Sequence, residues 1–386
     1  MATLREERER EAGEQRKLRI RVAVAVVVLL AGVAGVGLLA GGRPVKPGRG
    51  TFQPASADPV QAAVPVLAGY VEQARGLLFK TKPVVTVVDA AAFAKIVAEP
   101  LTGVGAANRQ ATAQALGLAH PGGAGTADVE AFYSYPRRQV VLRDDMKFDA
   151  FGRVVLAHEL AHALADQNFD LLAMTKAAAV NSDRLRALDA LIEGDATRLE
   201  LAYLGTQSRA DQADVHRRYN YDPVPASFAD NTRLFPYTVG RDFVTAVAEA
   251  GGNPALDAAF RRPPTSTAQI IDPRKYLGGV LPIGVRAPAA EGTTVDQGSL
   301  GQFGLALLIS HGRRVANVSA TSQWVGDSYV TFRSGRGFCT YDNVVMNTSA
   351  ARDQLFTDLA PLAQIPANRT RITKSSERGV RLQACT

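Results

Sequence analysis

Histidine, cysteine and tryptophan are scarce in this chain, which has five His, two Cys and one Trp among 386 residues. Because histidines are so few, two of them at a spacing that suits one metal ion argue against coincidence. No internal repeat is evident either, as a repeat architecture would require. The informative features are therefore single motifs and their positions along the chain.

The body of the chain also lacks a strong net charge. The whole chain carries +7, of which residues 1–21 contribute two and Arg43, Lys46 and Arg49 contribute three, which leaves about +2 after Gly50. A basic field large enough to hold nucleic acid is absent, so we exclude nucleic acid as a partner. The basic N-terminal segments instead suit the anionic headgroups of a membrane.

Residues 22–40 form a run of 19 residues without a charge. As a helix this run measures about 28 Å, enough to cross a hydrocarbon core of about 30 Å. Seven basic side chains precede it and three follow closely, which predicts a cytoplasmic N-terminus. The alternative is a cleaved signal peptide, but the preceding segment is long, no lipobox Cys follows, and the nearest Ala-x-Ala, at 55–57, is too distant. We favour an uncleaved signal-anchor with an extracytoplasmic remainder.

The pentapeptide from His158 to His162 reads HELAH, an HExxH motif. Residues four apart share one face of a helix, so both imidazoles can reach one Zn²⁺, while Glu159 stands beside them to polarise a water. The alternative is that both histidines are ordinary polar surface residues. Apolar flanks predict a buried helix over 149–167, in which two imidazoles need a partner.

Catalytic zinc sites usually have a third protein ligand and a water. A second apolar helix is predicted over 181–207, with Ser182 and Asp183 as its expected N-cap, and it carries Glu193 among small residues that allow close helix packing. We predict Glu193 as the third ligand. The alternative, a solvated helix residue, loses weight because HExxH lies 31 residues upstream of Glu193.

The segments HELAHALADQNF at 158–169 and LIEGDA at 191–196 resemble the gluzincin branch of the zincins, in which two His and a downstream Glu hold zinc. More narrowly, they resemble a family of uncharacterised membrane-anchored bacterial proteins that also carry segments similar to STAQIIDPRKY at 266–276 and WVGDSY at 324–329. The resemblance spans about residues 132–330. It implies an α+β zincin-like core, mostly helical with a small sheet, and zinc peptidase activity.

Two positions depart from what the resemblance implies. The family pattern has His before Pro, and this chain has Asp272 at that position. In gluzincins a downstream His or Tyr often steadies the oxyanion. Tyr276 is the nearest candidate for that role here. In thermolysin-like enzymes an Asp four residues after the third ligand orients a zinc-bound His. Here Thr197 stands at that position, and a hydroxyl is a weaker substitute.

The rest of the chain predicts a Gly/Pro-rich linker at 41–57, a zincin-like catalytic core over 58–210 and a C-terminal subdomain over 211–386 that closes the cleft. Strands are expected at 84–88, 131–135, 139–142, 329–332 and 338–345, and further helices at 58–80, 90–98, 108–116, 241–250, 300–310 and 349–363. Residues 139–142 could be the edge strand on which an extended peptide lies, or an ordinary strand of the sheet.

Cys339 and Cys385 fall on the extracytoplasmic side, where we expect them to pair and tie the C-terminal tail to a strand. Trp324 and Tyr329 are expected to be packing residues. The sequence thus predicts a single-pass, membrane-anchored zinc metallopeptidase with His158, His162 and Glu193 as ligands and Glu159 as general base, acting on a peptide or protein substrate. The alternatives are a catalytically silent zincin-like scaffold and a structural envelope protein with an incidental motif.

Overall fold

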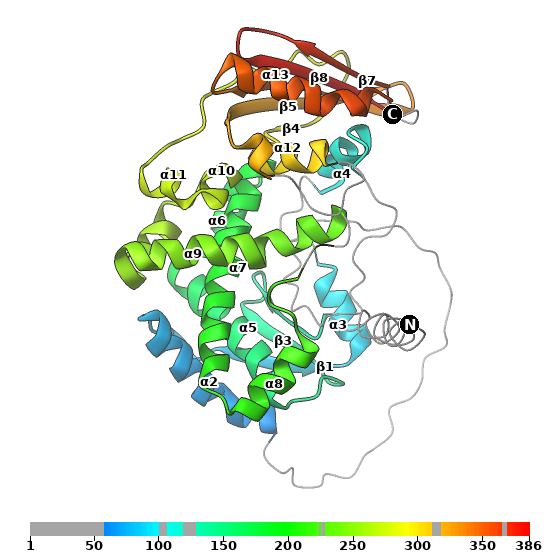
Figure 1. Ribbon diagram of the computed structural model, residues 1–386. Coiled ribbons are helices and arrows are strands. Elements are labelled where there is room, and N and C mark those ends of the chain that lie inside the picture. Colours follow the sequence, from blue (N-terminus) through cyan, green and yellow to red (C-terminus); the bar gives the residue numbers. More distant parts are fainter. Residues whose placement is uncertain are drawn as a thin grey trace, which may run out of the picture.

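The computed structural model describes residues 58–99, 106–118, 129–223, 225, 228–310, 318–364 and 369–386 (Figure 1). Within these ranges no helix combines the length and the apolar character needed to cross a membrane. The proposed anchor at 22–40 and the linker at 41–57 lie outside the described residues.

The first unit is a helical layer around a small three-stranded sheet (lower part of Figure 1). Its elements are α2 (Pro59–Arg75), β1 (Val84–Val88), α3 (Ala90–Val97), β2 (Ala131–Ser134), β3 (Gln139–Arg143), α5 (Ala150–Phe169), α6 (Leu171–Ala178), α7 (Ser182–Gly205), α8 (Arg209–Arg218) and α9 (Phe228–Arg261). Helix α9 is interrupted at Gly251 and Gly252, which have non-helical backbone angles.

The three strands lie in the order β1-β3-β2, with β1 parallel and β2 antiparallel to β3. Because β3 is paired on both sides, the expectation that residues 139–142 form the edge strand is wrong, and the ordinary-strand interpretation holds. The parallel partner lies more than 50 residues earlier in the chain, so local sequence could not reveal it. The edge strands of this sheet are β1 and β2.

Helices α7 and α9 cross in direct backbone contact. A Cβ at Gly194 would lie 2.3 Å from the Gly240 carbonyl oxygen, and a Cβ at Gly240 would lie 2.3 Å from the Ala190 carbonyl oxygen. Glycine is therefore required at both positions, as the small residues around Glu193 suggested. The contact lets α9 lie directly over the part of α7 that carries Glu193.

A buried ion-pair network fastens the same region. Arg75 of α2 donates to Asp195 of α7 at 2.7 Å and to Asp257 of α9 at 2.8 Å. Burial alone lowers the pKa of Arg75, but the two carboxylates outweigh it and raise the pKa. Removing one partner of such a pair leaves an uncompensated buried charge, so this network holds the three helices together.

The second unit is a five-stranded antiparallel sheet in the order β4-β5-β6-β8-β7, with helices packed on one face (upper part of Figure 1). Its strands are β4 (Thr294–Gly298), β5 (Trp324–Ser334), β6 (Gly337–Met346), β7 (Arg369–Lys374) and β8 (Gly379–Cys385), and its helices are α4 (Ala106–Ala115), α12 (Gly301–Ile309) and α13 (Ser349–Leu359). Two short helices, α10 (Thr267–Ile271) and α11 (Pro273–Leu277), join the units. Trp324 and Tyr329 are buried, as expected of packing residues.

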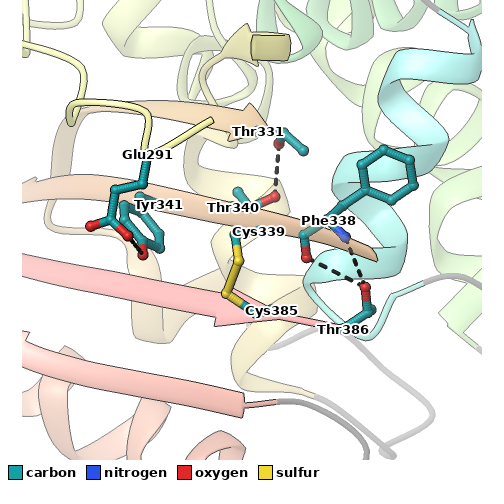
Figure 2. The surroundings of a disulfide bond; sticks show 8 residues. All are labelled: Glu291, Thr331, Phe338, Cys339, Thr340, Tyr341, Cys385 and Thr386. Carbon is teal, nitrogen blue, oxygen red and sulfur yellow. Dashed lines mark hydrogen bonds between the residues drawn. A yellow bond between two sulfur atoms is a disulfide. The ribbon is translucent and has the colours of Figure 1, made fainter. Parts of the chain in front are cut away.

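The predicted disulfide between Cys339 and Cys385 is present (Figure 2). The two cysteines face each other across the β6 and β8 pair, with their Cα atoms 4.1 Å apart. Beside the bridge, the amide of Thr386 donates to the carbonyl of Phe338 at 3.0 Å. The C-terminal tail is thus tied to a strand both covalently and by hydrogen bonds.

One buried carboxylate, Asp183, ties α7 to the joining helix α10, and another, Asp327, fixes the start of α12 within the second unit. Asp183, in the first turn of α7, accepts hydrogen bonds from the amide and hydroxyl of Thr267 in α10. Asp327 of β5 accepts from the amides of Leu300 and Gly301 at the start of α12.

The N-cap of α7 is Asn181, whose side chain accepts from two first-turn amides, so the expected cap at 182–183 is displaced by one residue.

The division expected at residue 210 differs from the packing. The first core continues through α8 and α9 and includes Val215, Phe235, Phe243 and Phe260, because α9 packs along α7. Conversely, α4 packs on the second sheet, where the Thr112 hydroxyl hydrogen-bonds to Thr331 of β5. Helices α8 and α9 therefore pack with the first unit although they follow residue 210, and α4 packs with the second unit although it precedes it.

The contact between α7 and α9 predicts that Gly194→Ala destabilises the protein by about 1–3 kcal/mol, since the methyl group overpacks against backbone that cannot yield. Chemical unfolding measured by circular dichroism checks this. Gly205→Ala, in the same helix with nothing within 4 Å of a Cβ, is the matched control and should have little effect. Equal stabilities for the two variants would refute the contact.

Candidate metal centre

Helix α5 carries the HExxH motif through the interior. Asp149 caps its first turn by accepting from the amides of Phe151 and Gly152, and the helix ends at Asp170, which has a left-handed φ of 56°. The helix predicted over 149–167 is confirmed. Its apolar residues are buried on nearly all sides, so His158, Glu159 and His162 are buried with them.

Three side-chain atoms converge at this point. The Nε2 atoms of His158 and His162 lie 3.0 Å apart, and the Glu193 Oε2 atom lies 3.3 Å from the first and 3.4 Å from the second. A tetrahedral zinc with bonds of 2.0–2.1 Å separates its ligand atoms by about 3.3 Å. These three residues are the group with metal-binding spacing among the described residues. The predicted third ligand therefore lies beside the predicted pair.

The electrostatics of this group fit a cation. Burial alone lowers the pKa of His158, but hydrogen bonds to Glu193 and Glu200 raise it well above its usual range. Burial alone raises the pKa of Glu193, but His162 and His158 lower it to about 2. The cluster thus favours positive charge. A divalent ion would replace the protons that the imidazoles and the carboxylate would otherwise bind.

Glu159 lies beside the cluster without joining it. No side chain among the described residues donates a hydrogen bond to its carboxylate oxygens, and the side chain is fully buried. Burial raises the pKa of Glu159, whereas His158 and His162 lower it. Glu159 is thus a buried carboxylate next to the candidate metal ligands that does not bond to any of them.

A carboxylate that orients His158 comes from an unexpected position. Glu200 of α7 lies 2.8 Å from the Nδ1 atom of His158 through Oε2, and its Oε1 atom accepts from the Tyr221 hydroxyl at 2.7 Å. This contact directs Nε2 of His158 toward the metal position. Thr197, the substitute inferred from the sequence, has a buried hydroxyl without a partner among the described residues. The expectation for Thr197 is therefore wrong.

Two buried tyrosines interact with the ligand residues. The ring of Tyr237, on α9, stacks on His158 with the ring centroids 6.2 Å apart. The Tyr135 hydroxyl has no hydrogen-bond partner among the described residues, and burial followed by Glu193 and Asp189 raises its pKa well above the usual range. Tyr135 is thus a neutral, unused donor close to the carboxylates of the site.

Tyr276, the candidate from the sequence, lies in a different setting. Its hydroxyl donates to the Arg262 carbonyl at 2.9 Å, and its ring packs edge-on against Phe243. None of its described contacts involves the three ligand residues, and its role in catalysis stays a prediction. Asp272 caps α11 by accepting from the Arg274 amide and also pairs with the Arg274 guanidinium.

Four residues of this site escaped the sequence reasoning: Glu200, Tyr221, Tyr135 and Tyr237. Only Glu200 left a usable signal, because it follows Glu193 by seven residues, two helical turns, and so shares its face of α7. The tyrosines come from three other segments and are brought in by tertiary packing. No family model matches the chain, and comparisons with curated proteins and with solved structures return no match.

If Glu200 orients His158, Glu200→Gln should weaken zinc binding by about 10–100-fold without abolishing it, as for other outer-shell partners of metal-bound His. Competition with a fluorescent zinc chelator measures the affinity. Thr197→Val is the matched control on the same helix face and should bind zinc like the unmodified chain. A loss in the Thr197 variant instead would assign the role to the hydroxyl.

Proposed function

We propose that this protein is a membrane-anchored, extracytoplasmic zinc metallopeptidase. The observation that carries the proposal is the triangle of buried side-chain atoms from His158, His162 and Glu193, with separations of 3.0–3.4 Å, beside the buried carboxylate of Glu159. The resemblance of the segments at 158–169 and 191–196 to gluzincins supports the same class.

In the proposed reaction, zinc would supply the Lewis acidity that lowers the pKa of a water and polarises a peptide carbonyl. Glu159 takes a proton from the attacking water and returns it to the leaving amine. Glu200 holds the ring of His158 in register. A tyrosine hydroxyl donates to the carbonyl oxygen as negative charge develops there, and Tyr135 and Tyr276 are the two candidates.

The backbone around β2 supports a peptide as the substrate. β2 is an edge strand of its sheet, and the backbone of Tyr133 lies close enough to Glu159 to lower its pKa. An extended peptide paired with β2 would therefore pass the general base, as strand addition to a sheet edge requires. We therefore propose β2, and not β3, as the strand along which the peptide lies.

The second candidate is a catalytically silent zincin-like scaffold of the cell envelope. The observation that favours it is the depth of the site, because His158, Glu159, His162 and Glu193 are all 2% exposed or less. A scaffold needs only the metal and its surrounding packing. An enzyme must also admit a peptide to Glu159.

Substitutions of the site separate the two candidates. Glu159→Gln keeps the outline of the side chain but removes the proton acceptor, so zinc content should hold while hydrolysis of casein or a peptide library falls by about 10²–10⁴-fold. His162→Ala should lose zinc, and Glu193→Gln should weaken its binding. Undiminished hydrolysis by the Glu159 variant contradicts the mechanism, and bound zinc without hydrolysis in the unmodified chain favours the scaffold.

The oxyanion donor is tested by paired substitutions. If Tyr135 serves, Tyr135→Phe should lower kcat by about 10²-fold with zinc content unchanged, while Tyr276→Phe should leave both intact. The reverse pattern would restore the role to Tyr276. Steady-state kinetics on one peptide substrate, with metal analysis of each variant, distinguishes the outcomes.

The proposed location rests on the apolar run at 22–40 and the excess of basic residues before it. A reporter that folds only outside the cytoplasm, fused after Gly50, should be active. The same reporter fused before Val22 is the control and should be silent. If instead only a reporter that works in the cytoplasm is active when fused after Gly50, the proposed topology is wrong.

A further inference from the structure

The last residue of α11 and the loop that follows it present four aliphatic side chains to solvent. Leu277, Val280, Leu281 and Ile283 are 49%, 54%, 66% and 45% exposed. Nine large hydrophobic residues are exposed among the described residues, and these four fall within seven consecutive positions. Single exposed hydrophobic residues are ordinary, but a contiguous cluster marks a surface that is covered in use.

Hydrogen bonds hold this loop in its exposed conformation. The amide of Val280 donates to the Lys275 carbonyl at 2.8 Å, and the Val280 carbonyl accepts from the Gln269 side chain at 2.8 Å. The amide of Ile283 donates to the Val325 carbonyl of β5 at 2.8 Å. The backbone is therefore anchored to the joining helices α10 and α11 and to β5 of the second unit, while the four aliphatic side chains stay exposed.

The residues around the loop are predominantly basic. Residues 262–286 contain four basic side chains and one acidic one, Asp272, which pairs with Arg274. The basic residues are Arg262, Arg274, Lys275 and Arg286. Arg274 is 89% exposed. An apolar tip with a basic border matches the two layers of an anionic membrane surface, acyl chains below and negative headgroups above.

We propose that residues 277–283 form a membrane-contact loop. Its aliphatic side chains enter the interface of an anionic bilayer, and the basic residues of 262–286 contact the headgroups. Each basic residue near such a surface strengthens partitioning by roughly fivefold. The linker at 41–57 has 17 residues and reaches at most about 60 Å when extended, which would keep an anchored domain near the bilayer. The loop does not depend on zinc or on peptidase activity.

The test uses the full chain reconstituted in lipid nanodiscs, with Leu281→Cys labelled by an environment-sensitive fluorophore. The native cysteines are joined to each other, so the added thiol is the one labelled. In discs of phosphatidylcholine with phosphatidylglycerol, the probe emission should shift to the blue and be quenched by spin-labelled acyl chains. The quenching should fall several-fold in pure phosphatidylcholine and at high salt.

Leu78→Cys supplies the matched control, because Leu78 is 73% exposed, lies outside residues 262–286 and should stay in water in every disc. Arg274→Glu combined with Lys275→Glu should abolish the quenching at position 281 while the circular dichroism spectrum is unchanged. A probe at 281 that is as unquenched as the one at 78 in all lipids overturns the proposal. A response at 281 to added casein but not to lipid also overturns it and assigns the loop to a protein partner.

Discussion

The burial of three ligand atoms in an apolar interior is the constraint on which the surrounding structure depends. His158, His162 and Glu193 come from two helices, and their polar atoms meet within 3.4 Å, where water does not solvate them. Such a group is costly unless its members are paired or hold a metal. The helices α5 and α7 must therefore be fixed against each other to within a few tenths of an ångström. The glycine contact with α9 and the Arg75 network both act on the stretch of α7 that carries Glu193.

Local sequence patterns predicted which side chains would meet because helical spacing decides which residues share a face. The expected helices at 149–167 and 181–207 agree with α5 and α7 within two residues at each end, and the strand at 84–88 agrees with β1. The pairing of Cys339 with Cys385 was also predictable, since two cysteines allow one bridge. The gluzincin architecture itself rests on the resemblance and stays a prediction.

Features set by long-range packing could not be read in advance. The central position of β3 depends on a parallel partner far earlier in the chain, and α4 joins a sheet whose first strand begins 188 residues after the start of α4. Helix α9 begins at Phe228, well before the expected start at 241. The earlier part was not predicted because the helix continues through Pro236, where local rules predict a break. Tyr135 and Tyr237 reach the site through tertiary packing alone. Glu200 was not predicted because it lies seven residues after Glu193, whereas the thermolysin-like pattern has the orienting carboxylate four residues after the third ligand.

We expect a zinc ion held by two imidazoles and one carboxylate, and X-ray absorption spectroscopy at the zinc edge of the purified full chain tests this directly. The spectrum should show two histidine nitrogens with oxygen completing a tetrahedral shell, all at about 2.0–2.1 Å. Sulfur should be absent, since both cysteines are in the disulfide. A sulfur shell at about 2.3 Å, a shell without histidine, or purified protein that takes up no zinc would contradict the account.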